Sequence, residues 1–224
     1  MVKRILAACA HPDDETLGCG GTLLRHAAEG AELHWLIGTE PEGERFDDAF
    51  RRRREGQIAA VAAAYGFRSV SRLGFPTTTL DSCAPGDIIA AIGPVVAKVD
   101  PDVVYMVHSG DVHGDHRALH AAMAVALKPM RNSRPSEIYA YETLSSTNLT
   151  PPTVGRPFLP QVYVEITNEL SRKLEILRLY EGEVFQPPHP RSCEAVEALA
   201  RYRGASVHFG AAEAFMIVRK LWGA

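Results

Sequence analysis

The sequence predicts an α/β fold in which a mostly parallel sheet is flanked by helices. Short apolar runs alternate with longer helical stretches along the chain, which is the pattern of successive β-α-β units. The length of 224 residues and the hydrophobic content of 46% suit one domain with a sizeable core. No repeat or linker interrupts the chain, so we expect a single domain over residues 1–224.

Strands are expected at the short apolar runs, which span residues 4–10, 33–38, 70–73, 103–107, 138–141 and 162–166. Helices are expected between them, at residues 17–29, 51–65, 87–98, 117–127, 169–180 and 194–203. The first two helices stop at Gly30 and Gly66, and Pro94 indicates a kink in the third. This alternation predicts a Rossmann-like sheet with its active site beyond the carboxyl ends of the strands.

Charge and hydropathy exclude several classes of partner. The net charge of -3 offers no basic surface for nucleic acid, and the single basic run, Arg51 to Arg54, is interpreted as the solvated start of a helix. No apolar run approaches the ~20 residues of a membrane span. The apolar stretch after Lys3 and Arg4 is too short for a signal peptide and is followed at once by acids. We therefore expect a soluble, cytoplasmic protein that binds neither nucleic acid nor a membrane.

The four cysteines are Cys9, Cys19, Cys83 and Cys193, and they show no CxxC spacing. Free thiols in a reducing compartment are therefore expected. Cys9 lies inside the first expected strand and Cys19 lies among glycines, so both are interpreted as small buried residues rather than ligands.

Two clusters of histidine and acidic residues carry the functional signal. Residues 11–15 read His-Pro-Asp-Asp-Glu and follow the first expected strand, while residues 111–116 read Asp-Val-His-Gly-Asp-His and follow the strand at 103–107. Each cluster alone has an ordinary explanation, a turn or a helix N-cap. Together, at two strand ends, they predict one shared site at the edge of the sheet.

Two imidazoles and one carboxylate, with water in the fourth position, make up a catalytic zinc site. Because Asp13 and Asp14 are adjacent, their side chains should diverge, so that one faces the metal and the other accepts a proton from the water. Glu15 is expected to hydrogen-bond a ligand histidine or the backbone.

The second cluster offers His113 and His116. One of them is expected to be a ligand, while the other faces the substrate. A protonated imidazole there, held in its charged form by Asp115, could stabilise an oxyanion. Three loops, at residues 40–48, 145–160 and 186–190, are candidates for the walls of the site.

A dinucleotide-binding loop is the rival interpretation of the glycines at 18, 20 and 21. The spacing Gly-x-Gly-x-x-Gly is absent, and the three acids before the glycines would repel a pyrophosphate. This interpretation is therefore disfavoured.

The two motifs resemble those of the LmbE/PIG-L family of zinc-dependent N-acetylglucosamine deacetylases. Residues 10–15, with the glycines that follow, match the first family motif, and residues 111–116 match the second. Softer matches extend the resemblance over nearly the whole chain, at Arg52, Glu55, Gly66, Tyr141, Glu142, Lys173, Tyr180 and residues 212–215.

The resemblance implies a role for each matching residue. It implies His11, Asp14 and His116 as zinc ligands, and Fe(II) or Co(II) would also suit this donor set. It implies Asp13 as the general base and His113 as the oxyanion stabiliser, with Asp115 supporting His113. It also implies Arg52 and His208 as substrate contacts. Some family members carry a tyrosine at the position of Asp111, and its role is not transferred to this chain.

The function implied by the resemblance is metal-dependent removal of an N-acetyl group from the 2-amino position of an N-acetylglucosamine-type sugar. Two alternatives stay open, namely hydrolysis of a different acyl or carbamoyl amide, and a catalytically silent module that binds a saccharide or a metal. The expected partner is a small amino-sugar substrate. Homo-oligomers are frequent in the family, so one is also considered.

Overall fold

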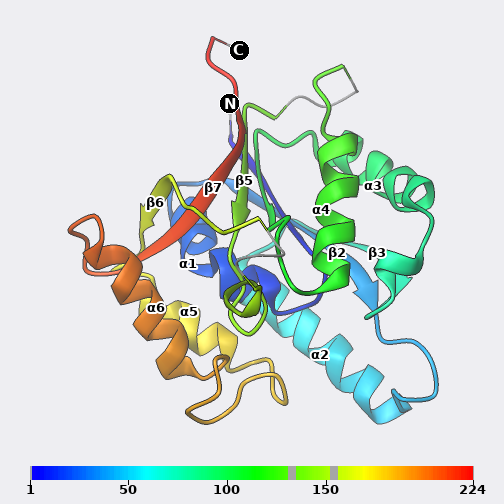
Figure 1. The fold of residues 1–224 in the computed structure, drawn as a ribbon, viewed down its shortest axis with the longest axis horizontal. Helices are drawn as coiled ribbons and strands as arrows, with labels where there is room; N and C mark the ends of the chain where they lie inside the picture. The colour runs from blue at the N-terminus through cyan, green and yellow to red at the C-terminus, as the bar shows by residue number, and fades with distance from the viewer. Residues whose placement is uncertain (1, 131–134, 152–155, 224) are drawn as a thin grey trace.

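A seven-stranded sheet organises the part of the chain that the structure describes, residues 2–130, 135–151 and 156–223 (Figure 1). The structure is a computed structural model. The strand order is β3-β2-β1-β4-β5-β7-β6. The strands are β1 Arg4–Cys9, β2 Glu32–Glu40, β3 Ser69–Pro76, β4 Val103–Val107, β5 Glu137–Tyr141, β6 Val162–Glu165 and β7 Ala212–Lys220. The first five run parallel, whereas β7 is antiparallel to β5 and β6.

The predicted α/β class and the six predicted strands are confirmed, and β7 is the strand that the sequence pattern missed. Its first four residues are buried and the following five are partly or fully exposed. The apolar run at residues 214–218 is offset from the buried residues 212–215, which include Glu213, so the burial of this strand does not follow its apolar pattern.

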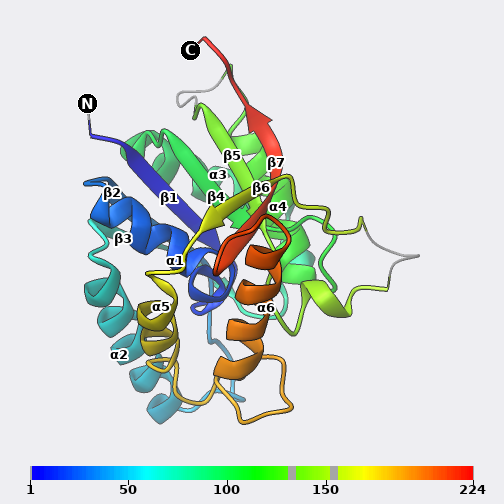
Figure 2. The ribbon, with the colours of Figure 1, turned by 90° about the vertical axis from the view of Figure 1, so that its left-hand side faces the viewer.

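Six helices cover the described part of the sheet on both faces, together with two short 3-10 turns. They are α1 Asp14–Ala28, α2 Asp48–Tyr65, α3 Pro85–Val99, α4 Gly114–Ala126, α5 Leu170–Leu177 and α6 Cys193–Ala205, with the turns η1 Leu80–Ser82 and η2 Thr147–Leu149. Figures 1 and 2 show α3 and α4 on one side of the sheet, and α1, α2, α5 and α6 on the other. All six predicted helices are present, and α3 continues through Pro94.

The order of the strands reverses between β1 and β4. From β1 the chain moves outward through β2 to β3, and it then returns to the other side of β1 with β4 and β5. The two central strands pair in parallel, with Ala8 opposite Met106, so their carboxyl ends lie side by side. Ligands bind at such a switch point in open α/β sheets, and both histidine clusters follow these two strands.

Helix α1 is broken at Cys19, whose φ of -140° and ψ of 17° are not helical. The break frees backbone N–H groups that a continuous helix would satisfy. Glu213 of β7 accepts two of them, from Gly21 at 2.8 Å and Thr22 at 2.7 Å, and Lys173 Nζ lies 2.7 Å from the same carboxylate. A buried ion pair therefore holds α1, α5 and β7 together behind the site.

The glycines of α1 allow close packing. A Cβ atom on Gly18 would lie 2.0 Å from the ring of Tyr141, and one on Gly21 would lie 2.8 Å from Ile166. Helix α1 therefore presses directly on β5 and on the residue that follows β6.

The cysteines and the basic run can be compared with the expectations from the sequence. Cys9 and Cys19 are fully buried. The basic run lies in the first turns of α2, where Arg52 and Arg53 are exposed, as expected, but Arg54 is buried. No helix among the described residues combines the length and the apolar content that crossing a membrane requires.

Candidate active site

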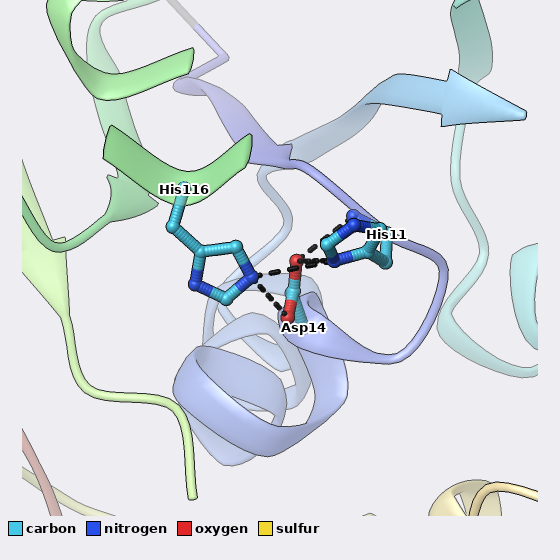
Figure 3. A group of neighbouring side chains, drawn as sticks. All are labelled: His11, Asp14 and His116. Atoms are coloured by element: carbon cyan, nitrogen blue, oxygen red, sulfur yellow. Dashed lines mark hydrogen bonds and ion pairs between the residues drawn. The ribbon is translucent and has the colours of Figure 1, made fainter. Parts of the chain in front are cut away.

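Two turns bring the predicted ligands together. His11 lies between the end of β1 and the start of α1 at Asp14, and His116 lies in the first turn of α4. Figure 3 shows these three side chains pointing toward one another. The carboxylate of Asp14 also accepts the backbone N–H groups of Ala10, at 3.1 Å, and His11, at 2.9 Å, which fixes the turn around it.

The nitrogen and oxygen atoms of this group are spaced as metal ligands. His116 Nε2 lies 3.3 Å from His11 Nδ1 and 3.3 Å from Asp14 Oδ1, and His11 Nδ1 lies 3.6 Å from Asp14 Oδ2. Ligands about 2.0–2.1 Å from a tetrahedral zinc ion are separated by roughly 3.3–3.4 Å. The three side chains therefore fit a divalent metal in identity, in number and in spacing.

Each histidine of the group has a carboxylate at its other ring nitrogen. His11 Nε2 is hydrogen-bonded to Asp115 Oδ2 at 2.9 Å, and His116 Nδ1 forms an ion pair with Asp111 Oδ2 at 3.1 Å. Such outer carboxylates fix the ring orientation and the tautomer of metal-binding histidines. This arrangement leaves His11 Nδ1 and His116 Nε2 facing the shared point.

The neighbouring acids change the proton affinity of the two rings. Burial lowers the pKa of His11, but contacts with Asp115 and Asp14 outweigh it and raise the pKa to about 9. Burial is likewise outweighed at His116, where Asp14 and Asp111 raise the pKa to about 10. The negative charges of these carboxylates favour a proton on each ring. The same charges would favour a metal cation that replaces the proton.

Asp111 contacts both histidines of the second motif, and the sequence predicts no role for it. Besides the ion pair with His116, its carboxylate accepts the backbone N–H of His113 at 2.8 Å and the hydroxyls of Ser146 and Thr147. Burial raises the pKa of Asp111, but the contact with His116 outweighs it, so the pKa is lowered. The acid is therefore ionised and positions both histidines of the second motif.

The carboxylate of Asp115 contacts His11 rather than His113, which corrects the expectation that it holds His113. Its oxygens also accept the backbone N–H groups of Thr78, at 2.6 Å, and Leu80, at 3.0 Å. Only its backbone N–H reaches His113, donating to Nδ1 at 3.2 Å. The reason is geometric, because Asp115 lies in the first turn of α4 while the β3–η1 segment supplies N–H groups on its other side.

The sequence predicts a protonated imidazole at His113, whereas the structure favours the neutral ring. Burial first, and then the charges of His11 and His116, lower the pKa of His113, which favours the neutral ring. Because Nδ1 accepts a hydrogen bond from Asp115, the proton of the neutral ring belongs on Nε2. His113 therefore offers an uncharged N–H donor.

Asp13 adopts a φ of 136°, a conformation that non-glycine residues avoid. Its backbone N–H donates to Glu15 Oε2 at 3.2 Å, and Glu15 is held by Thr16 and Tyr180. Glu15 thus hydrogen-bonds the backbone, one of the two roles expected for it. Burial and the charge of Asp14 raise the pKa of Asp13 to about 7, although Arg191 lowers it.

Arg191, which the sequence analysis did not single out, lies beside Asp13. Its Nη1 is 2.9 Å from Asp13 Oδ2 and 3.1 Å from Glu183 Oε2. Arg54 pairs with the other oxygen of Glu183 and donates to the carbonyl oxygen of Pro12 at 3.2 Å. The signal that could have found Arg191 is the stiff segment at 186–190, which directly precedes it.

The two expected substrate contacts, Arg52 and His208, are both exposed and lie outside the cavity lining. Arg52 is exposed on α2, whereas Arg54, two positions further on, is buried and lines the cavity. His208 is exposed between α6 and β7 and does not line the cavity among the described residues. The structure therefore brings neither Arg52 nor His208 to the site.

A cavity of about 340 Å³ opens above these groups, a size typical of small-molecule sites. Its lining includes His11, Asp13, Asp14, His113 and His116. Two of the three predicted loop walls contribute to it, with Glu40, Pro41 and Phe46 from the first and Ser145 and Ser146 from the second. Residues 152–155 of the second predicted wall lie outside the described residues.

Comparisons with known proteins place this architecture in a family. The family model described as PIG-L, GlcNAc-PI de-N-acetylase, matches residues 6–127, so the chain belongs to the PIG-L family. A 1D-myo-inositol 2-acetamido-2-deoxy-alpha-D-glucopyranoside deacetylase of Rhodococcus erythropolis is 27% identical over 231 residues, with 87% of this chain and 72% of the relative covered.

An uncharacterized deacetylase of Escherichia coli, YaiS, is 31% identical over 186 residues, which cover 80% of this chain and 91% of the relative. Among solved structures, the conserved protein TT1542 of Thermus thermophilus superposes with a TM-score of 0.79 at 24% identity, covering 100% of this chain and 98% of that one. This likeness confirms the fold.

Proposed function

We propose that this protein is a zinc-dependent N-deacetylase that removes the acetyl group from the 2-amino position of an N-acetylglucosamine-type sugar. The observation that carries the proposal is the convergence of His11, Asp14 and His116 in one cavity, beside the buried acid Asp13. Family membership and the amino-sugar substrate in the name of the Rhodococcus relative support it.

His11, Asp14 and His116 would hold the metal. A zinc ion in this position supplies a Lewis acid that polarises an amide carbonyl and acidifies a water molecule. Fe(II) and Co(II) also suit two imidazoles and a carboxylate, and metal analysis of the purified protein decides among them.

Asp13 is the proposed general base. Its carboxylate takes the proton of the attacking water and later returns it to the nitrogen of the departing amine. Burial and the charge of Asp14 raise the pKa of this carboxylate, which makes it a stronger proton acceptor than an exposed aspartate. Arg191 lies at one of its oxygens and restricts the orientation of the carboxylate.

His113 is the proposed donor to the oxyanion of the tetrahedral intermediate. Its Nε2–H can donate to the carbonyl oxygen without a change in protonation, while Asp111 and Asp115 hold the segment that carries it. Removing one such donor typically costs about 10²–10³ in kcat. We also transfer to Arg54 the sugar-binding role that the resemblance implied for Arg52, since Arg54 lines the cavity.

The test of these roles is the variant Asp13→Asn, compared with Asp87→Asn, which changes an exposed acid of α3. Asp13→Asn should abolish acetate release from N-acetylglucosamine glycosides while the bound metal, measured by elemental analysis, stays at the wild-type level. Near-full activity of Asp13→Asn would refute the assignment of the base. If the wild-type protein binds the sugar without releasing acetate, a catalytically silent binding module is favoured instead. If it releases a different acyl group, the protein is a hydrolase with another substrate.

A further inference from the structure

Two phenylalanines line the same cavity as the proposed metal ligands. Phe46 precedes α2 and Phe50 lies in its first turn, with ring centroids 5.0 Å apart and planes inclined by 39°. Both side chains are only partly buried and both line the cavity. We name this pair the aromatic wall. It has no part in the proposed reaction, so its partly exposed rings require another explanation.

The aromatic wall is held in place. Arg51 donates to the carbonyl oxygens of Pro41, at 3.4 Å, and Gly43, at 2.9 Å, which ties the loop to α2. Arg45 donates to the hydroxyl of Thr78 at 2.6 Å, and the N–H of Thr78 in turn donates to Asp115. The loop that carries Phe46 is therefore connected to the carboxylate that orients His11.

Guanidinium groups lie over both rings. The central carbon of the Arg45 guanidinium is 4.6 Å from the centroid of Phe46, and that of Arg54 is 5.4 Å from the centroid of Phe50. Because Arg54 also donates to the carbonyl oxygen of Pro12, Phe50 is only one side chain away from the turn that carries His11 and Asp13. A ligand whose amide reaches that turn can therefore also reach the wall.

The two arginines that line the cavity, Arg54 and Arg191, both have acidic partners. Arg54 pairs with Glu183, Arg191 pairs with Asp13 and Glu183, and Glu40 pairs with Arg72 at 2.7 Å. Among the described residues that line the cavity, no arginine is left without an acid to receive a carboxylate or phosphate of the substrate. Arg45 and Arg53 lie over the rings of Phe46 and Phe50, at 4.6 Å and 5.2 Å, but neither lines the cavity. A charged group inside the cavity would therefore lose water without gaining an ion pair with a lining arginine.

We propose that the substrate carries, next to its N-acetylated sugar, an uncharged group with an apolar face that stacks on Phe46 and Phe50. This inference rests on the proposed deacetylase function. An aryl ring and the C–H face of a second pyranose ring share this chemistry. Aromatic contacts of this kind contribute about 2- to 10-fold in affinity beyond burial alone.

The experiment measures kcat/KM for acetate release from four substrates. They are free N-acetylglucosamine, its phenyl glycoside, its β-1,4-linked disaccharide and its carboxymethyl glycoside, which bears a carboxylate. We expect the phenyl glycoside or the disaccharide to exceed both the free sugar and the carboxymethyl glycoside by about 10-fold, mainly through KM. Whichever of these two glycosides has the higher kcat/KM shows whether the apolar face is an aryl ring or a second pyranose ring. Equal values for all four substrates, or the highest value for the carboxymethyl glycoside, would overturn the inference but not the deacetylase function.

Matched variants assign the effect to the wall. Phe46→Leu and Phe50→Leu keep most of the apolar volume but remove the ring, and each should reduce the preference for the apolar glycoside about 2- to 10-fold. The control Phe209→Leu changes a partly exposed phenylalanine outside the cavity lining and should keep the preference. An unchanged preference in both wall variants contradicts the stacking. Acetate release from none of the substrates, with metal bound, refutes the proposed function itself.

Discussion

Replacing Asp115 with asparagine tests how the proposed metal ligands are supported. Three N–H donors, from His11, Thr78 and Leu80, share the two oxygens of this carboxylate. Asparagine has one acceptor oxygen and an amide NH₂, so at least one donor must face another donor. The hydrogen bond to His11 also loses its charge assistance, which roughly halves its strength.

Loss of an outer carboxylate typically weakens metal binding 10- to 100-fold, or about 1.4–2.7 kcal/mol. We therefore expect the zinc Kd of Asp115→Asn to rise by this factor, measured by competition with a chromophoric chelator. The matched control is Asp102→Asn, which removes a carboxylate that accepts the backbone N–H of Arg4 at 2.7 Å, far along β1 from the site. A zinc Kd of Asp115→Asn within threefold of wild type would refute the reasoning.

Three further predictions concern stability. Lys173→Met leaves Glu213 buried without its counter-ion and should lower the free energy of unfolding by about 3–5 kcal/mol in urea denaturation; a loss below 1 kcal/mol would contradict a tight buried pair. Gly18→Ala should lower the free energy of unfolding by about 1–3 kcal/mol, because the new Cβ would meet the Tyr141 ring. The control Gly56→Ala, in open space on α2, should raise it by roughly 0.5–1 kcal/mol. Equal effects of the two substitutions would show that the close approach at Gly18 is absent. Burial lowers the pKa of His26 to about 4. Between pH 4 and 6.5 the unfolded chain therefore binds more protons at this residue than the folded chain does. The free energy of unfolding should fall by up to about 3 kcal/mol as the pH drops through this range. His26→Gln should flatten that dependence in unfolding curves taken from pH 7 to 4, and an unchanged slope would argue against it.

The strand–helix alternation and the position of the site could be predicted because both depend on local patterns. Buried parallel strands are continuous apolar runs, and the two histidine clusters directly follow two of them. Adjacency of β1 and β4 then brings His11 and His116 together without further information. The three proposed metal ligands therefore follow from short motifs.

The supporting residues could not be predicted, because tertiary packing selects them. Four consecutive arginines span a full helical turn, so the sequence does not indicate that Arg54 rather than Arg52 faces the cavity. Arg191 reaches Asp13 from 178 positions away. The sequence predicts that Asp115 holds His113, yet its carboxylate hydrogen-bonds His11, because the β3–η1 segment determines its orientation.

The central claim is that a metal held by His11, Asp14 and His116 is required for deacetylation. The most direct measurement is acetate release from N-acetylglucosamine glycosides by the protein as purified, after removal of metal with a chelator, and after addition of zinc. We predict that release stops when the metal is removed and returns when stoichiometric zinc is added. Undiminished acetate release from protein shown by elemental analysis to be free of metal would contradict the account.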